Sequence, residues 1–303
     1  MEVNNNPAPM PPMEDLVEEK KPTSLLVAQF FLFPLIIIAI CVGIFLLFGY
    51  LTYEQRDARD YLNEIRTGSD TRRWQAAYEL SNIITTEKER LKNTGFVEDL
   101  TAVYRNSRGD TLQEGSTTRT DPRIRQFLAL TMGRLGDARA VPALTEGLND
   151  PEVENQIYTL WALGSIGDNA AVPGIVKELR NDDPSVRKVA AYVLGSIKDP
   201  RASRDLQVAL NDPSKDVQWS AAIALAQLQD PAGAELLMKL LDRSYVSQLE
   251  GMTDEQRNEL RSNAIKCLGI LKFPAARDKI SELSQNDPDL SVRDVSLEAL
   301  KKF

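Results

Sequence analysis

Few residues of this chain have side chains suited to chemistry. The sequence contains no histidine and only two cysteines, Cys41 and Cys267. Without histidine there is no imidazole base, no Ser-His or Cys-His nucleophile pair and no histidine-ligated metal. Cys41 lies in an apolar segment and Cys267 in a late predicted helix, so we expect no disulfide between them. We therefore expect a protein that is not an enzyme and that uses no cofactor.

Aspartate recurs at a fixed spacing. It stands 31 residues apart at Asp137, Asp168, Asp199 and Asp230. A calcium or magnesium site needs several carboxylates that converge on one point, whereas residues at a fixed period are spread along the length of a repeat array. We expect no metal site here and assign these aspartates to turns, where each can cap the helix that follows.

The aspartates belong to a longer internal repeat. Four similar segments begin 31 residues apart, and a small residue falls in register in all of them, at Gly133, Gly164, Gly195 and Ala226. Such a period indicates a solenoid of stacked helix pairs. The first helix of a pair is exemplified by Val186–Ile197, with apolar residues at helical spacing. We predict an all-α fold, an α-solenoid that occupies residues 70–303 and follows one transmembrane helix.

Proline-containing turns separate the repeats, because proline cannot continue a helix. The sequence Asn-Asp-Pro stands at 149–151, 211–213 and 286–288, and Asn-Asp-Asp-Pro at 181–184. The intervals between the small residues lengthen in two places, which predicts insertions near 85–121 and 244–255. Within the first insertion the polar stretch 107–121 is predicted to be a mobile loop.

An uncharged segment precedes the repeats. Residues 25–51 read LLVAQFFLFPLIIIAICVGIFLLFGYL. About 20 apolar residues suffice to cross a bilayer, so we predict a single transmembrane helix at 25–51. A cleaved signal peptide is the alternative, but its apolar region would be about 7–15 residues long.

The remaining segments complete the domain organisation. Residues 1–24 are rich in proline and asparagine, and this composition predicts a disordered N-terminal tail. Residues 52–69 predict a helical stalk that docks on the first repeat. Lys20 and Lys21 precede the apolar segment and Arg56, Arg59 and Arg66 follow it. By the positive-inside rule this small excess favours a cytoplasmic location for the large domain.

The run DPSVRKVAAYVLGSIKDPRA at 183–202 resembles HEAT-like repeats of the short type found in phycobilisome lyases. The resemblance covers roughly residues 70–303. It implies a right-handed α-solenoid whose concave face, lined by the second helices, holds a partner. Lyases of this subgroup attach a bilin to a cysteine of another protein. No feature of this chain marks that activity, and a transmembrane anchor departs from those soluble proteins.

Tryptophan and arginine residues are the candidates for contact with a partner. Trp74 and Trp219 share a repeat position that is elsewhere partly polar. They are candidates for exposed anchors, since tryptophan is enriched in interface hot spots, and the alternative is local packing against the chain that precedes them. Trp161 shares a position that is apolar in every repeat, so we predict it to be a core residue. Arginine recurs at one first-helix position, at Arg125, Arg187 and Arg293. Two interpretations are open: these side chains bind carboxylates of a partner or lipid headgroups, or they form a solvated edge of the solenoid.

These observations favour a membrane-anchored scaffold or accessory subunit of a membrane complex. The partners would be membrane-associated proteins bound on the solenoid surface, together with the bilayer itself. A formal net charge of −8 argues against nucleic acid, which requires clustered lysine and arginine. Two alternatives remain: a regulator or sensor that uses the 107–121 loop or the tail as a switch, and a lyase-like modifying subunit.

Overall fold

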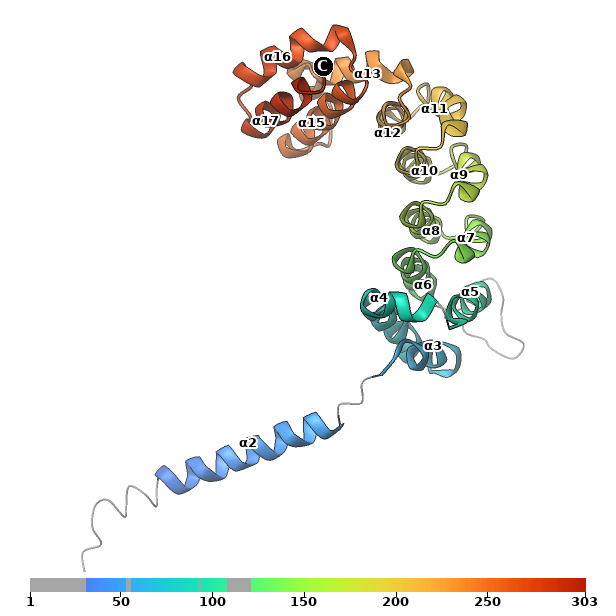
Figure 1. The fold of residues 1–303 in the computed structure, drawn as a ribbon, viewed down its shortest axis with the longest axis vertical. Coiled ribbons are helices and arrows are strands. Elements are labelled where there is room, and N and C mark those ends of the chain that lie inside the picture. The colour runs from blue at the N-terminus through green and yellow to red at the C-terminus, as the bar shows by residue number, and fades with distance from the viewer. Residues whose placement is uncertain (1–30, 53–55, 93, 108–120) are drawn as a thin grey trace, which may run out of the picture. The chain divides into compact units, whose positions relative to one another are not determined.

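The computed structural model describes residues 31–52, 56–92, 94–107 and 121–303. The chain divides into two compact units, Met1–Gln55 and Arg56–Phe303. Every regular element in the described part is a helix, as Figure 1 shows. The predicted all-α class is therefore confirmed for these residues.

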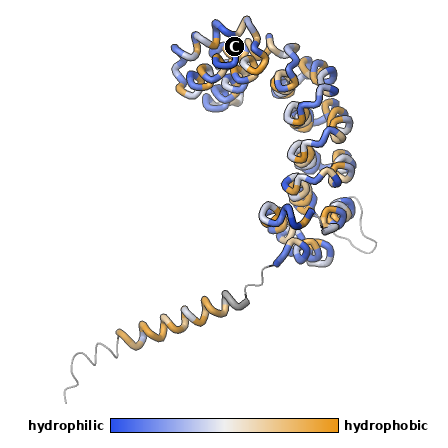
Figure 2. The backbone as a smooth tube through the Cα atoms, in the orientation of Figure 1, coloured by the Kyte–Doolittle hydropathy of each residue, from blue (hydrophilic) through white to orange (hydrophobic). Residues whose placement is uncertain are grey.

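The described element of the first unit is one helix, α2 (Phe33–Thr52). The residues from Phe31 to Phe48 are exposed, and α2 is coloured as hydrophobic along most of its length in Figure 2. Among the described residues, no helix combines the length and the hydropathy needed to span a membrane. The predicted transmembrane helix at 25–51 begins outside the described residues and is not confirmed by the structure.

The second unit is built from two rows of helices. The first row contains the longer helices, α4 (Asp70–Lys92), α6 (Pro122–Leu135), α8 (Val153–Ile166), α10 (Pro184–Ile197), α12 (Lys215–Gln227), α15 (Asp254–Ile270) and α17 (Leu290–Leu300). The second row contains α5 (Phe96–Asn106), α7 (Val141–Gly147), α9 (Val172–Glu178), α11 (Ser203–Ala209), α13 (Ala234–Leu240) and α16 (Arg277–Asn286). Figure 1 shows helices of the two rows side by side, and this arrangement is the predicted solenoid.

The family resemblance implied that the second helices line the concave face, and this expectation is wrong. In Figure 1 the row α6, α8, α10 and α12 lies on the inner side of the curve that this unit describes, with α7, α9 and α11 outside it. The long first helices therefore supply the inner surface, and the second helices of seven residues supply the outer one.

Two short helices stand outside the paired pattern. The first is α3 (Ala58–Thr67), which begins with a capping box between Asp57 and Asp60 and buries Leu62 and Ile65 against the unit's core. The second is α14 (Arg243–Ser247), which lies at the second predicted insertion. The predicted tail, 1–24, and nearly all of the predicted loop at 107–121 lie outside the described residues.

The recurring aspartates are helix caps, as the sequence predicted. The side chains of Asp137, Asp168, Asp199 and Asp230 each accept a hydrogen bond from the backbone N–H two residues later. Each of these bonds satisfies a donor that the following short helical turn leaves without a partner. The regular 31-residue spacing thus reflects a structural requirement that is repeated once per helix pair.

The small residue of each first helix permits close contact with the next first helix. A Cβ atom added to Gly195 would lie 2.7 Å from the Cα atom of Ala224. At Gly164 the nearest atoms would instead be the side-chain methyl groups of Val193, at 3.1 and 3.2 Å. The backbone of α10 therefore approaches that of α12 more closely than a side chain would allow.

This difference predicts unequal effects of the same substitution. Gly195→Ala is expected to lower the free energy of unfolding by about 1–3 kcal/mol, as overpacking of a core does. Gly164→Ala is the matched control and is expected to lower it less, because a valine side chain shifts more easily than a backbone. Alanine favours a helix equally at both positions, so the difference in urea midpoints isolates the packing term. Equal midpoints would contradict the prediction.

Candidate partner-binding surface

Aromatic side chains gather on the exposed face of the first-helix row. We call Tyr78, Phe127, Tyr158, Trp161 and Tyr192 the aromatic ridge. Its members come from α4, α6, α8 and α10, and four of them are between 37% and 48% exposed, Phe127 being partly buried. A first helix is covered by neighbouring first helices on two sides and by the second row behind. The only side of such a helix left for an exposed aromatic ring is the inner surface of the solenoid.

Two pairs of ridge residues contact each other across repeats. The rings of Trp161 and Tyr192 have centroids 5.1 Å apart with an interplanar angle of 59°. The rings of Tyr78 and Phe127 meet edge to face at 5.4 Å. Such pairs are each worth about 0.5–1.5 kcal/mol beyond area burial. Protein interfaces use half-exposed aromatic surfaces of this kind as anchors.

An open groove of about 780 Å³ adjoins the ridge at α3, α4 and α6. Tyr61, Trp74, Tyr78 and Phe127 supply its aromatic walls. Its charged lining residues have both signs: Arg56, Arg72, Arg123, Glu64 and Glu79. The Arg123 guanidinium lies 4.3 Å from the centre of the Trp74 ring and forms an ion pair of 2.6 Å with Asp121. Trp74 is half-buried and lines this groove, so a role for it in partner binding stays a prediction.

The structure reverses the predicted roles of the other two tryptophans. Trp219 is 6% exposed and belongs to a core cluster that also contains Val246 of α14. The prediction that it is an exposed anchor is therefore wrong. Trp161, predicted to be in the core, is 42% exposed and belongs to the ridge.

Arg125 and Arg187 bind carboxylates of their own chain. The buried Arg125 forms an ion pair of 2.7 Å with the buried Asp150, and Arg187 one of 2.8 Å with Asp212. In each case the aspartate lies 25 residues later, in the turn before the next first helix. The sequence offered two interpretations of these arginines, contact with a partner or a solvated edge. Both are wrong for Arg125 and Arg187. They join one repeat to the next.

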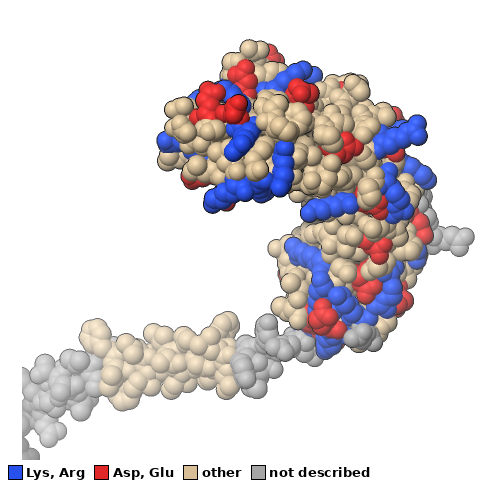
Figure 3. All heavy atoms as spheres, turned by 45° about the horizontal axis from the view of Figure 1, so that its top comes forward, with Lys and Arg blue, Asp and Glu red and all other residues tan. Residues whose placement is uncertain are grey.

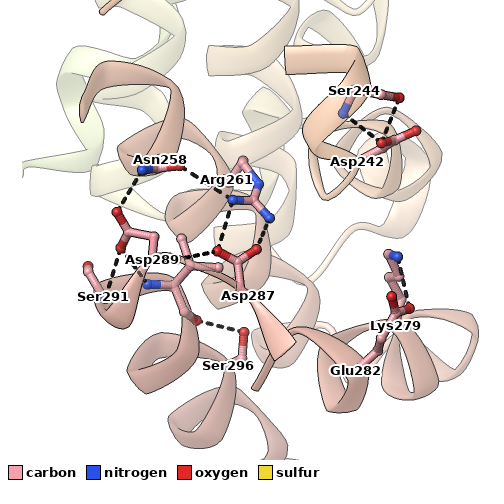
Figure 4. A network of polar contacts seen from close by, with 11 residues as sticks. Asp242, Ser244, Asn258, Arg261, Lys279, Glu282, Asp287, Asp289, Ser291 and Ser296 are labelled. Atoms are coloured by element: carbon pink, nitrogen blue, oxygen red, sulfur yellow. Dashed lines mark hydrogen bonds and ion pairs between the residues drawn. The ribbon is translucent and has the colours of Figure 1, made fainter. Parts of the chain in front are cut away.

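A third pair, which sequence reasoning missed, follows the same rule. Arg261 pairs with Asp287, and both side chains are at most 3% exposed. Figure 4 shows this ion pair beside the hydrogen bond from Asn258 to Asp289. The missed signal was the common interval of 25 or 26 residues between each arginine and its aspartate. Arg293, the last predicted arginine, has no carboxylate partner in the described part of the chain.

The Arg187 pair predicts a loss of stability in acid. The hydrogen bond from Arg187 holds the pKa of the Asp212 carboxyl below its ordinary value of 3.8. A carboxyl whose folded-state pKa is lowered stabilises the fold above its unfolded pKa, and that stabilisation is lost as pH falls through the folded pKa. Urea midpoints are expected to fall below about pH 4. Asp212→Asn should show a smaller fall between pH 6 and pH 3 than the wild type, and an equal fall would contradict this account.

The cysteine of the solenoid is unsuited to nucleophilic chemistry. Cys267 is 4% exposed, and burial raises the pKa of its thiol to about 11. A thiol must ionise to act as a nucleophile or metal ligand.

Comparisons with known proteins bear on the fold. A model of HEAT repeats matches residues 109–177 and 172–249. The prediction of HEAT-like repeats is therefore confirmed for this part of the chain. No curated protein matches the sequence.

Among solved structures, the chain is similar to the complex of CpcE and CpcF of phycocyanin lyase from a Nostoc species. The identity is 23% and the TM-score 0.51, over 82% of this chain and 88% of that one. An engineered protein is 20% identical with a TM-score of 0.49, over 82% of this chain and 68% of that one. At this identity the likeness to the lyase complex supports the solenoid fold and no particular activity.

Proposed function

We propose that this chain is a membrane-anchored scaffold that binds protein partners along the aromatic ridge and catalyses no reaction. The stacked, half-exposed pair Trp161–Tyr192 carries the proposal. Large aromatic side chains left in water lose the free energy that burial would provide. Tryptophan and tyrosine are also the residues over-represented in interface hot spots. The HEAT-like solenoid provides the extended surface on which such anchors can act together.

The charge distribution favours a protein over a nucleic acid as the partner. Figure 3 shows lysine and arginine interspersed with aspartate and glutamate on the face of the solenoid unit that it displays. A phosphate backbone requires a continuous stripe of positive charge. The net charge of −8 is of the opposite sign.

The membrane anchor belongs to the proposal and rests on the 25–51 segment. It holds 27 residues without a charge, and a bilayer needs about 20. The described side chains of this segment include large apolar groups in solvent, such as Phe45, which is 76% exposed. Lipid would remove this surface from water. The arginines that follow the segment favour the cytoplasmic side for the solenoid.

Two fractionation experiments test the anchor. The full chain is expected to resist extraction of membranes with alkaline carbonate, and a chain lacking 25–51 to appear in the supernatant. Protease added to sealed cells should leave the solenoid intact and should degrade it once the membrane is opened. Extraction of the full chain by carbonate would contradict the anchor. Digestion in sealed cells would contradict only the orientation.

Crosslinking in the membrane tests the scaffold. The full chain, tagged at its C-terminus, is crosslinked in its native membrane, purified in detergent and analysed by mass spectrometry. Subunits of a membrane complex are expected at stoichiometric amounts. Val208→Ala is a control outside the aromatic ridge, because it alters an exposed apolar residue of α11 in the second row. This variant should recover the same partners. Recovery of the chain alone would contradict a stable scaffold.

A further inference from the structure

The exposed stripe of α8 carries side chains in the order polar, hydrophobic, hydrophobic, polar. Glu154, Tyr158, Trp161 and Ser165 lie at i, i+4, i+7 and i+11, so they face one side of the helix, and all four are exposed. The equivalent positions of α6 and α10 follow the same order. We call the residues at the two central positions of these three helices the hydrophobic band: Phe127, Leu130, Tyr158, Trp161, Val189 and Tyr192. Val189 is buried and the other five are partly or fully exposed, so the band runs from repeat to repeat between two polar edges.

The width of the hydrophobic band matches that of a helix. Glu154 and Ser165 stand at its two edges in α8 and are eleven residues apart. Because a helix rises about 1.5 Å per residue, the two edges are about 16 Å apart. A helix with its side chains is about 10–12 Å across, whereas extended chains lie only about 4.8 Å apart in a sheet. A helix laid across α6, α8 and α10 would cover most of the band, and one extended chain would leave much of it in water.

The hydrophobic band also offers few hydrogen-bond partners to a peptide backbone. Extended peptides are held on protein surfaces mainly through main-chain hydrogen bonds, and a buried backbone group that lacks one is costly. None of the six band residues is asparagine or glutamine, and their only polar groups are two tyrosine hydroxyls and the indole N–H of Trp161. A helix satisfies its own backbone groups internally. The chemistry of the band therefore favours a helix as its occupant.

The polar edges of the band differ in charge. The edge at the N-terminal ends of the first helices carries Glu154 and, in α12, Asp216. Both are exposed, and neither forms an ion pair within the described part of the chain. Arg123 stands on the same edge, but it is already paired with Asp121 at 2.6 Å. The other edge holds serine in both α8 and α10. A complementary partner would therefore place lysine or arginine along the first edge.

The helices that the structure describes in this chain do not meet these requirements. Packed helices have axes about 8–10 Å apart, so an occupant that crosses three first helices needs about fourteen residues. The helix α2 is long enough, but it holds no charged residue. The other helices of at least this length are α4, α6, α8, α10 and α15, and their hydrophobic faces are buried in the solenoid.

We propose that the inner surface of α6, α8 and α10 binds one amphipathic helix of a different protein, which lies across these three helices. Hydrophobic side chains seven residues apart on this helix contact the band, and basic side chains on one flank face Glu154 and Asp216. Seven residues of a helix rise about 10.5 Å, so successive hydrophobic side chains meet successive first helices. The inference rests on the proposed function, because it names the form of the partner that the aromatic ridge binds.

Site-specific photocrosslinking tests the form of the partner in the full chain, in the cells that produce it. A benzophenone amino acid replaces Leu130, Trp161 or Tyr192, one at a time. We expect adducts to one segment of one partner, mapped by mass spectrometry. Adducts from neighbouring first helices should lie about seven residues apart, and those from positions 130 and 192 about fourteen apart.

The outcomes separate this inference from the proposed function. Adducts about three residues apart from neighbouring first helices would indicate an extended chain and would overturn the inference. Adducts to unrelated segments or to a second copy of this chain would overturn it as well. These outcomes leave the ridge as a protein-binding surface. If none of the three positions gives an adduct, the ridge is not a binding surface, and both the inference and the proposed function fail.

Charge reversal tests the basic flank of the partner helix. In the chain with the crosslinker at position 161, Glu154→Lys is expected to lower the adduct yield at least tenfold, because like charges then face each other. Glu235→Lys is the matched control, since Glu235 is also exposed and in the first turn of its helix, but that helix, α13, belongs to the second row. It should leave the yield within twofold of that of the otherwise unaltered chain. Equal yields from the two variants would overturn the proposal.

Discussion

A chain that carries Trp161→Ala and Tyr192→Ala is expected to recover its protein partners at least tenfold less well than the wild type. Truncation of a central aromatic anchor at an interface costs about 2 kcal/mol or more, and 1.4 kcal/mol corresponds to a factor of ten in affinity. Both rings are nearly half exposed, so their removal leaves no sealed cavity in the core. Crosslinking followed by quantitative mass spectrometry measures the loss.

The matched comparison separates binding from folding. The double variant should keep the helical circular dichroism of the wild type and lose only about 1–2 kcal/mol of stability, mostly from the aromatic pair itself. Val208→Ala changes a more exposed apolar residue on the opposite row and should leave partner recovery unchanged. If the double variant recovers partners as well as Val208→Ala does, the ridge is not the binding surface.

Arg125→Ala is expected to destabilise the solenoid by about 3–5 kcal/mol, which is the cost of leaving a buried charge without its partner. The Asp150 side chain that it leaves behind is 2% exposed. Asn155 and the backbone N–H of Glu152 still donate to this carboxylate, each at 3.0 Å. Neither supplies a positive charge. Arg125 also covers the Tyr104 ring, with its guanidinium carbon 4.3 Å from the ring centre.

An exposed pair provides the control for this effect. Arg180 and Asp205 lie 3.1 Å apart, but the Arg180 side chain is 77% exposed. Arg180→Ala is therefore expected to cost at most about 1 kcal/mol. Tryptophan fluorescence follows both unfolding transitions in the detergent-solubilised full chain, because all three tryptophans lie in the solenoid unit. Similar urea midpoints for the two variants would contradict a stabilising role for the buried pair.

A double variant tests the cause of the loss. Adding Asp150→Asn to Arg125→Ala removes the buried negative charge as well, so part of the lost stability should return. If the second substitution only adds to the loss, the destabilisation comes from lost packing of the arginine and not from an uncompensated charge. The coupling between the two substitutions then measures the pair directly.

The sequence by itself determined the repeat and its local structure. The 31-residue period, the small residue of each first helix and the capping aspartates are local requirements. A turn needs its cap, and a helix that lies against another needs a residue without bulk. Such requirements recur once per helix pair, so the spacing of the residues alone reveals them. The helical class and the solenoid follow from them.

Which side chains face solvent was decided by tertiary structure. Trp161 stands at a position that is apolar in every repeat, yet its side chain is exposed on the inner surface of the solenoid, because neighbouring pairs cover the other sides of α8. Trp219 stands at a partly polar position, yet it is buried, in a cluster that includes α14 from the insertion. Burial in a solenoid depends on the adjacent repeats, and periodicity within one helix does not report what those repeats cover.

The same distinction explains the arginines. In the sequence, Arg125 and Arg187 form one recurring series and the aspartates of the turns form another, and the two series were interpreted separately. Only the stacking of the helix pairs brings Asp150 to Arg125 and Asp212 to Arg187, because parallel first helices place the start of one beside the turn that precedes the next. The sequence thus determined the unit of this fold, and the packing of unit against unit decided which of its residues are left to meet a partner.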